Sequence, residues 1–354
     1  MLQQTRASVV VSYFLKWMEL FPDVNALAAA PLERVIKAWE GLGYYSRARN
    51  LHEGAKQIAQ QFGGEIPSSK EALASIPGLG SYTVGAILNF GFAQRAPAVD
   101  GNVFRVMSRY LAIEESIERS RVRKLIEEKT LALLDEKEPW ISSEALIELG
   151  ALVCRPMPQC DQCPLQAGCL GLQKGIAESL PIKNGKSPAI VLTRAVMVIE
   201  AQGHFLVRKG QSGKVMADLY EFPYFDFEEL LPKRKEILRS GKGRQGTCRG
   251  QIDSSLDPAL KDRDCAELPV QKDVGIGDVE SYLSRKFKIS AKCTRILQKR
   301  AHTFTKYKVW LYPFFLTADQ VLALDGWEWI AMDRLGELPF SSGHRTILAE
   351  VGSV

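Results

Sequence analysis

Apolar residues in the first 150 positions recur every three or four residues, which is the period of an amphipathic helix. Turn residues such as the Gly63-Gly64 pair separate these stretches, and almost no strand-like alternation occurs. The pattern therefore predicts an all-α first part. Its expected helices cover about 8–20, 31–41, 48–61, 70–75, 102–112, 119–134 and 140–152, with one more after Gly80.

The character of the sequence changes after Cys169. Lysine, glycine and proline are frequent up to Pro188, and beyond it short β-branched or aromatic runs alternate with turn residues, as in strands. This second half is predicted to be α+β, with an irregular insertion at 241–270. The expected organisation is a helical region at 1–153, a four-cysteine loop at 154–175, a linker at 176–188 and a second domain at 189–354.

Composition narrows the class of protein. A chain of 354 residues with 46% hydrophobic and 25% charged residues fits two globular domains and excludes disorder throughout. It contains no run of eighteen apolar residues and no basic-then-apolar leader, so we expect no membrane partner and a cytoplasmic location. The net charge of +5 is small, so any nucleic-acid site must depend on local contacts.

Four cysteines lie close together in the sequence. The spacing Cys154-x5-Cys160-x2-Cys163-x5-Cys169 brings four thiolates into one short loop, enough to close a tetrahedral zinc site or to hold an iron-sulfur cluster. A disulfide framework is not expected in a reducing cell. Spacing alone indicates a metal site and leaves both metals open.

The stretch from Ile76 to Asn102 carries the candidate chemistry. Gly78 and Gly80 flank one apolar residue in a sharp turn before a helix, and exposed amides at a helix start suit a phosphate group. Asp100 precedes a helix as an N-cap would. A capped carboxylate is fixed and ionised, so Asp100 could also stabilise positive charge on a nearby sugar. A plain helix turn and a purely structural cap are the alternatives.

These features together resemble the helix-hairpin-helix DNA glycosylases that carry an iron-sulfur cluster, and among them the adenine DNA glycosylases of the MutY type. That family removes adenine mispaired with 8-oxoguanine or guanine from duplex DNA. The resemblance rests on MLQQT at 1–5, GLGYYSRARNLH at 41–52, IPGLGSYTVGAI at 76–87, VDGNVFRV at 99–106, ELGALVC at 148–154 and the cysteine loop. It implies a 4Fe-4S cluster on Cys154, Cys160, Cys163 and Cys169 rather than zinc.

The resemblance also implies roles at the reacting sugar. Asp100 would stabilise the oxocarbenium-like sugar or its adduct, and Asn102 would help to place the reacting groups. At the position of Tyr82 the related endonuclease III type carries a lysine that forms a Schiff base and cleaves the strand. Tyrosine cannot form an imine, so base excision without lyase activity is expected.

Other positions match the residues with which the family contacts DNA. Tyr44 resembles the wedge beside the oxidised guanine, and Glu144 matches a polar position that touches the adenine. The matching positions that contact 8-oxoguanine are Gln3, Gln4 and Thr5. Gly78 and Gly80 would hold phosphate.

The second half resembles the Nudix-like domain with which the family reads the oxidised base. The matching segments are Leu219 to Pro223 and His302 to Thr305. Within the second segment, Phe304 and Thr305 are the candidate contacts to the oxidised base. No Nudix metal motif is present, so nucleotide hydrolysis is not expected. Lys306 stands where the family commonly has histidine, which leaves the lesion preference open.

Two departures from the family pattern bear on function. The first cysteine gap is five residues where the family usually has six, so Cys154 must follow a different path to its iron. The family also has a catalytic glutamate two residues before the methionine of MLQQT, and the chain begins at that methionine. We expect the true start to lie upstream; the alternative is a weakened or silent homologue.

The sequence therefore predicts a monomeric, monofunctional adenine glycosylase whose partner is duplex DNA with 8-oxoguanine:adenine mispairs, associated with the nucleoid of a bacterial-type cell. Protein partners are not indicated. One rival is a non-catalytic binder of such mispairs. The other is a pyrimidine glycosylase of the endonuclease III type, which Tyr82 and the long second domain disfavour.

Overall fold

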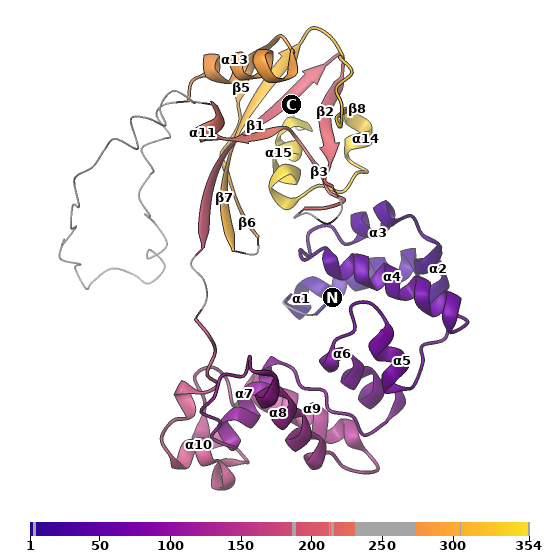
Figure 1. Cartoon of the computed structure of the whole chain (residues 1–354), viewed down its shortest axis with the longest axis vertical. Coiled ribbons are helices and arrows are strands. Elements are labelled where there is room, and N and C mark those ends of the chain that lie inside the picture. Colours follow the sequence, from indigo (N-terminus) through magenta and orange to yellow (C-terminus); the bar gives the residue numbers. More distant parts are fainter. Residues whose placement is uncertain are drawn as a thin grey trace, which may run out of the picture. The chain divides into compact units, whose positions relative to one another are not determined.

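Figure 1 shows the computed structural model of the chain. The structure describes residues 1–2, 5–185, 189–211, 213, 216–230, 274–304 and 306–352. Gln3, Gln4, Thr305 and the expected insertion at 241–270 lie outside the described residues. Contacts divide the chain into two units, one comprising Met1–Val35 with Tyr44–Ser187, the other Ile36–Gly43 with Pro188–Val354.

The first unit is helical, as the apolar period predicts. Its elements are α1 (Ala7–Leu20), α2 (Val24–Ala29), α4 (Ser46–Gln61), α5 (Lys70–Ser75), α6 (Ser81–Ala86), the π-helix η1 (Ile87–Gly91), α7 (Gly101–Tyr110), α8 (Ser120–Leu133), α9 (Pro139–Leu152), the 3-10 turns η2 (Cys160–Gln162), η3 (Gln166–Gly168) and η4 (Ala177–Ser179), and α10 (Leu170–Gln173). Helix α3 (Leu32–Ala38) spans the division between the units. The expected all-α part is confirmed, while α2 and η1 were not foreseen.

Local hydrogen bonds explain where several helices begin. The side chains of Asp23, Ser69 and Asp100 accept from backbone amides in the first turns of α2, α5 and α7, respectively. Gly63 and Gly64 both adopt positive φ after α4, which ends that helix as the sequence indicates. The Ser69 cap fixes the start of α5, which leads into the glycine hairpin. The candidate carboxylate, Asp100, is itself the cap at the start of α7.

The beginning of the expected linker is part of the helical unit. Ala177 and Leu180 are buried, and the amide of Ile117 donates to the carbonyl of Ile182 at 3.0 Å. Apolar packing and this hydrogen bond therefore hold residues 177–182 in the helical unit, although the sequence predicts a linker from 176 onward. The contact division falls later, between 187 and 188.

The second unit is α+β, as expected. Its strands are β1 (Ile190–Ala201), β2 (His204–Lys209), β3 (Tyr220–Glu221), β4 (Tyr224–Asp226), β5 (Ala291–Ile296), β6 (Arg300–Phe304), β7 (Tyr307–Ala318) and β8 (Glu328–Ala331). Its helices are α11 (Phe227–Leu230), α13 (Ile276–Phe287), α14 (Met332–Leu335) and α15 (Ser342–Gly352).

The sheet is built around the parallel pair β1 and β7, in the order β3-β2-β1-β7-β5, with β4, β6 and β8 paired alongside. Alternate residues of these strands fill two apolar cores. One core contains Met197 and Leu283 of α13, and the other contains Val198 and Ile347 of α15. In Figure 1 α13 and α15 accordingly lie on the two faces of the sheet.

The short segment Ile36–Gly43 is fastened within the second unit by Glu40. The Glu40 carboxylate accepts two guanidinium hydrogen bonds from Arg345, at 2.7 and 3.1 Å, and one from the amide of Phe340 at 3.0 Å. Such a bidentate pair fixes geometry as well as charge.

Among the described residues no helix is long and apolar enough to cross a membrane.

Candidate active site and cysteine loop

The glycine hairpin docks on α4 through two close contacts. Gly78 has φ +85°, and a Cβ there would lie 2.6 Å from Cβ of Asn50. Gly54 of α4 in turn receives Ile76, whose Cγ2 would lie 2.9 Å from a Cβ at that glycine. Leu79 packs against the core of this region. Position 78 requires glycine both because its φ is positive and because a side chain would collide with Asn50. Gly80, by contrast, has an ordinary backbone, with φ −83°.

Asp100 is held by three hydrogen bonds to its own helix. Its Oδ1 accepts from the amides of Asn102 and Val103 at 2.9 and 2.8 Å, and its Oδ2 accepts from the Asn102 side-chain Nδ2 at 2.9 Å. The N-terminal end of α7 also favours a negative charge. The carboxylate is therefore oriented and half-buried, as suits a group that stabilises a cation.

Tyr82 of α6 lies near this carboxylate. Burial and the negative charge of Asp100 both raise the pKa of the Tyr82 phenol, so the ring carries a neutral hydroxyl at neutral pH. The closeness depends on Gly85, because a Cβ there would lie only 2.0 Å from the carbonyl oxygen of Pro97. Asn89 adds a hydrogen bond of 3.1 Å to the carbonyl of Ala96. Together they hold the segment leading to Asp100 against the helix.

Arg105 connects this site with the cysteine loop. Its Nη2 donates to Oδ1 of Asn102 at 2.8 Å and to the carbonyl of Gly150 at 2.7 Å, and its Nε donates to the carbonyl of Cys154 at 2.7 Å. Gly150 of α9 packs directly on Asn102, where a Cβ would lie 2.6 Å away. Sequence reasoning did not single out Arg105, although its place three residues after Asn102 on one helix was a usable signal.

The four cysteine thiols surround a small cavity. Cys154, Cys160, Cys163 and Cys169 line it together with Arg109 and apolar residues, and all four are free thiols. The Nη1 of Arg109 lies 3.4 Å from Sγ of Cys154 and donates to the carbonyl of Arg155 at 2.6 Å. Burial and the other three cysteines raise the pKa of the Cys160 thiol. The thiols therefore influence one another across this cavity.

These residues fit a thiolate-bound metal group. Four sulfur donors around one cavity are the donor set of an iron-sulfur cluster, and the guanidinium of Arg109 would offset part of their negative charge. No three His, Cys, Asp or Glu side chains in the described part of the chain are arranged around a single ion. The cysteines thus share a cavity without meeting at one point.

Tyr44 has a strained backbone and an exposed ring. Its φ is +46°, a left-handed value that a bulky residue rarely adopts, and 53% of the residue is exposed. Arg47 lies over the ring at 5.5 Å and donates to the carbonyl of Met1 at 3.4 Å. Strain in an exposed aromatic residue is typical of a binding site. The structure thereby brings Tyr44 and Arg47 close to Met1, the start of the MLQQT segment.

The remaining predicted contacts are more dispersed. Thr5 is partly exposed just before α1, and Glu144 is exposed on α9. Phe304 belongs to the second unit, where its ring lies 5.2 Å from that of His302 and 5.5 Å from that of Tyr307. The described residues therefore unite Tyr82, Asp100 and Asn102, with Tyr44 in the same unit and Phe304 in the other.

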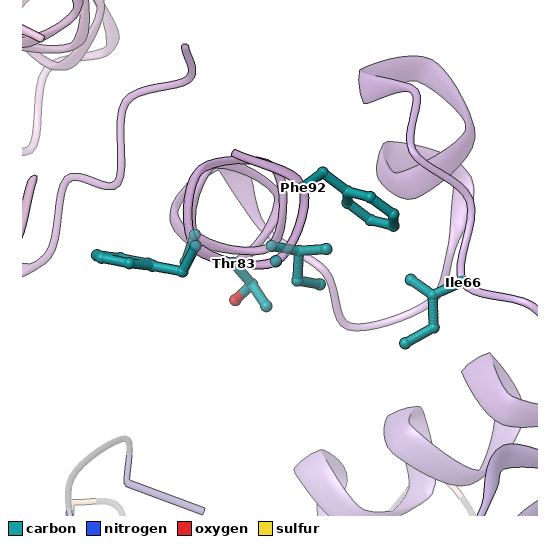
Figure 2. A pocket seen from close by; sticks show the side chains of 7 residues that line it. Ile66, Thr83 and Phe92 are labelled. Atoms are coloured by element: carbon teal, nitrogen blue, oxygen red, sulfur yellow. The ribbon is translucent and has the colours of Figure 1, made fainter. Parts of the chain in front are cut away.

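An open apolar hollow of about 560 Å³ lies on another side of α6 and η1. Figure 2 shows Thr83 and Phe92 on this helix and Ile66 on the segment opposite. It contains none of the predicted site residues, and it offers a single hydroxyl among aliphatic and aromatic side chains. The hollow is therefore unsuited to the charged chemistry of the Asp100 site.

The chain has clear relatives. Residues 1–130 match the family model described as HhH-GPD superfamily base excision DNA repair protein. The chain is 42% identical over 176 residues to the adenine DNA glycosylase of Rattus norvegicus, a match covering 49% of this chain and 34% of that protein.

Two bacterial relatives are matched over more of their length. Identity is 33% over 227 residues with the adenine DNA glycosylase of Buchnera aphidicola subsp. Baizongia pistaciae, covering 64% of each chain. It is 31% over 244 residues with that of Buchnera aphidicola subsp. Schizaphis graminum, covering 66% of this chain and 69% of the relative. The chain spans about a third of its mammalian relatives and just under two thirds of the first of these bacterial ones.

Proposed function

This chain belongs to the adenine DNA glycosylase family, and we propose that it excises adenine from duplex DNA, acting on adenine opposite 8-oxoguanine or guanine without cleaving the strand. The observation that carries the proposal is the Asp100 carboxylate, held at the start of α7 by two backbone amides and the Asn102 side chain. That arrangement fixes a negative charge near Tyr82 of α6.

Asp100 would act on the sugar. As the bond from C1′ to adenine breaks, its electrons leave with the base and positive charge develops on the sugar ring. A preorganised carboxylate stabilises that charge without having to reorient. Water then completes the reaction at C1′, while Asn102 keeps the carboxylate in place through its 2.9 Å hydrogen bond.

Tyr82 supports the absence of lyase activity. A Schiff base requires a nucleophilic amine, and the side chain of residue 82, near the carboxylate, is instead a phenol whose pKa is raised by burial and by Asp100. The phenol is a hydrogen-bond donor at neutral pH, suited to contacting the DNA or the leaving base. Strand cleavage by this site would therefore need a residue other than Tyr82.

The DNA would be held at two places in the first unit. The hairpin at Gly78 and Gly80 presents backbone amides for a phosphate of the strand. Tyr44, exposed and strained, would insert into the base stack as the target adenine leaves it. Gln3, Gln4 and Thr5 would contact the oxidised guanine, and Glu144 the adenine.

Cys154, Cys160, Cys163 and Cys169 would hold a 4Fe-4S cluster, which would supply a rigid, charged centre for the loop at 154–175. Arg109 and Arg105 tie that loop to α7. Purified protein should show the visible absorbance of an iron-sulfur cluster and contain iron and sulfide. Zinc without that absorbance would overturn the assignment.

The second unit would read the oxidised base as a Nudix-like domain. Phe304, at the end of β6, and Thr305 are the proposed contacts in the β6-β7 hairpin. Tyr220 and Phe222 belong to the apolar core against which Phe304 packs. Lys306 replaces the family's usual histidine, so the preference for 8-oxoguanine over guanine is to be measured directly.

A single-turnover assay on an 8-oxoguanine:adenine duplex tests the proposal. Since the departing adenine is helped by a proton donor, the chain should be compared with a version extended by the codons preceding Met1. Adenine release by either is expected, and Asp100→Asn should abolish it while leaving DNA binding nearly intact, because asparagine also caps helices well. Tight mispair binding without release in both versions would instead make the protein a mispair binder.

A further inference from the structure

One part of the sheet carries an exposed basic face. It consists of the first residues of β1 and β7 together with β6. In Figure 1 these strand ends run beyond α11 and α13. Val309 and Leu311 of β7 point into the core under α15, so the alternating residues Lys308 and Trp310 point to the other face. That face is therefore accessible at Lys308, while the opposite one is packed.

Strand register shows what surrounds Trp310. It pairs with Ala301 of β6 and Thr193 of β1, and its neighbour Lys308 pairs with Thr303. Directly paired residues present their side chains on the same face. The lysine-tryptophan face thus consists of Val191, Thr193, Lys299, Ala301, Thr303, Lys308 and Trp310. The side chains beside the Trp310 ring, Thr193 and Ala301, are small, so the ammonium groups of Lys299 and Lys308 project furthest from this face.

Trp310 gathers two cations. The Nζ of Lys299 lies 4.9 Å from the centre of its ring, and the Nζ of Lys308 lies 5.5 Å from it. Lys299 is also 5.8 Å from the ring centre of Tyr312. Attraction to the ring restrains flexible lysine side chains, so two positive charges are held over one patch.

Among the residues that the structure describes, none on this face is acidic. Asp226 and Glu350, described carboxylates beside these strands, are paired with Arg194 and Arg300 at 3.1 and 2.7 Å. Arg194 and Arg300 alternate with Thr193 and Ala301, so both ion pairs lie on the α15 side of the sheet. The lysine charges therefore remain available to an anionic partner.

We propose that the lysine-tryptophan face binds the sugar-phosphate backbone of duplex DNA. The ammonium groups lie over the ring, which leaves its surface to cations rather than to a stacked base and favours phosphate contact over single-strand stacking. This site adds a DNA contact to those at the hairpin and at the lesion-reading loop, which it adjoins through Thr303 and Lys308. It rests on the proposed function for the identity of its occupant.

Salt dependence of binding tests the site in the full chain. The dissociation constant for an undamaged duplex is measured at several salt concentrations for the wild type, Lys299→Ala, Lys308→Ala and the double variant. Each lost phosphate contact should lower the slope of log affinity against log salt by about 1, and by about 2 in the double variant. Trp310→Leu keeps both lysines, so it should leave the slope unchanged and weaken binding about threefold.

Lys292→Ala is the matched control. Lys292 is an exposed lysine that pairs with Thr317, at the other end of β7, so its removal changes the charge equally without touching the face. Equal slopes for Lys292→Ala, the two single variants and the wild type would overturn the proposal. Loss of single-strand binding with an unchanged duplex slope would also overturn it, in favour of a single-stranded occupant.

Adenine release by the same preparations separates this inference from the proposed function. If no preparation releases adenine but the slopes differ as expected, the DNA face stands and the glycosylase proposal fails. If release is normal and the slopes coincide, the glycosylase proposal stands and the face is wrong.

Discussion

The guanidinium of Arg105 donates to the side-chain oxygen of Asn102 at 2.8 Å. The side-chain nitrogen of Asn102, Nδ2, in turn donates to Oδ2 of Asp100 at 2.9 Å, so Arg105 restrains Asp100 through Asn102. The Nε of Arg105 donates to the carbonyl oxygen of Cys154 at 2.7 Å. The orientation of the candidate carboxylate is thereby linked to the first residue of the cysteine loop.

Replacing Arg105 should disturb both ends of this link. Arg105→Gln leaves the carbonyls of Gly150 and Cys154 without their charged donor, which costs on the order of 2 kcal/mol in the free energy of unfolding. Adenine release should fall at least about tenfold as Asn102 loses its restraint. Thermal unfolding and single-turnover release measure the two effects.

Arg119→Gln is the control for Arg105. It removes the same charge from an exposed ion pair with Glu115, 3.0 Å long, whose contribution to stability should be small. An Arg105→Gln protein with the stability and release rate of Arg119→Gln would show that the link has no effect.

Gly85→Ala should separate α6 from the segment before Asp100. The added Cβ would lie 2.0 Å from the Pro97 carbonyl oxygen, so either the helix or the segment must move. We expect a loss of about 2 kcal/mol of stability and slower adenine release. Gly91→Ala, where nothing lies within 4 Å, should be nearly neutral in both measurements. Equal behaviour of the two variants would contradict the proposed role of this contact.

Tyr82→Lys tests why strand cleavage is not expected. The new amine would lie beside Asp100, where it could attack C1′ and be trapped by borohydride as a covalent protein-DNA adduct. The wild type and Tyr82→Phe should give no adduct. If Tyr82→Lys gives none either, position 82 alone does not decide between excision and lyase activity.

His344 should make the second unit sensitive to acid. Its Nδ1 accepts from the amide of Phe222 at 3.0 Å, and burial, assisted by the charges of His302, Arg194 and Arg208, lowers its pKa from 6.5 to about 3. Between these values the unfolded chain binds a proton that the folded one does not. The free energy of unfolding therefore falls as the pH drops from 6.5 to 3, by up to on the order of 4 kcal/mol.

Denaturant unfolding followed across this pH range checks the sign. His344→Asn can still accept from Phe222 but does not titrate, so it should be less stable at neutral pH and lose less stability on acidification. A variant whose stability falls as steeply as that of the wild type would rule out His344 as the source.

The sequence determined the elements whose hydrogen bonds are local. The helices from Lys70 to Ser75 and after Asp100 are predicted closely, because a cap and the apolar period act within a few residues. The helix Val24–Ala29 also begins at a side-chain cap, Asp23, which the sequence prediction did not use, and the π-helix at 87–91 has no sequence signature.

The candidate chemistry divides in the same way. Asp100 with its cap and the four spaced cysteines could be recognised from the chain, since the partners of Asp100 lie two and three residues away and the cysteines share one loop. Tertiary structure alone decided that Tyr82 approaches Asp100, through Gly85 and Pro97, and that Arg105 joins Asn102 to Cys154. It also placed Lys299 and Lys308 over one ring. Such contacts depend on packing between separate elements, which local periodicity does not encode.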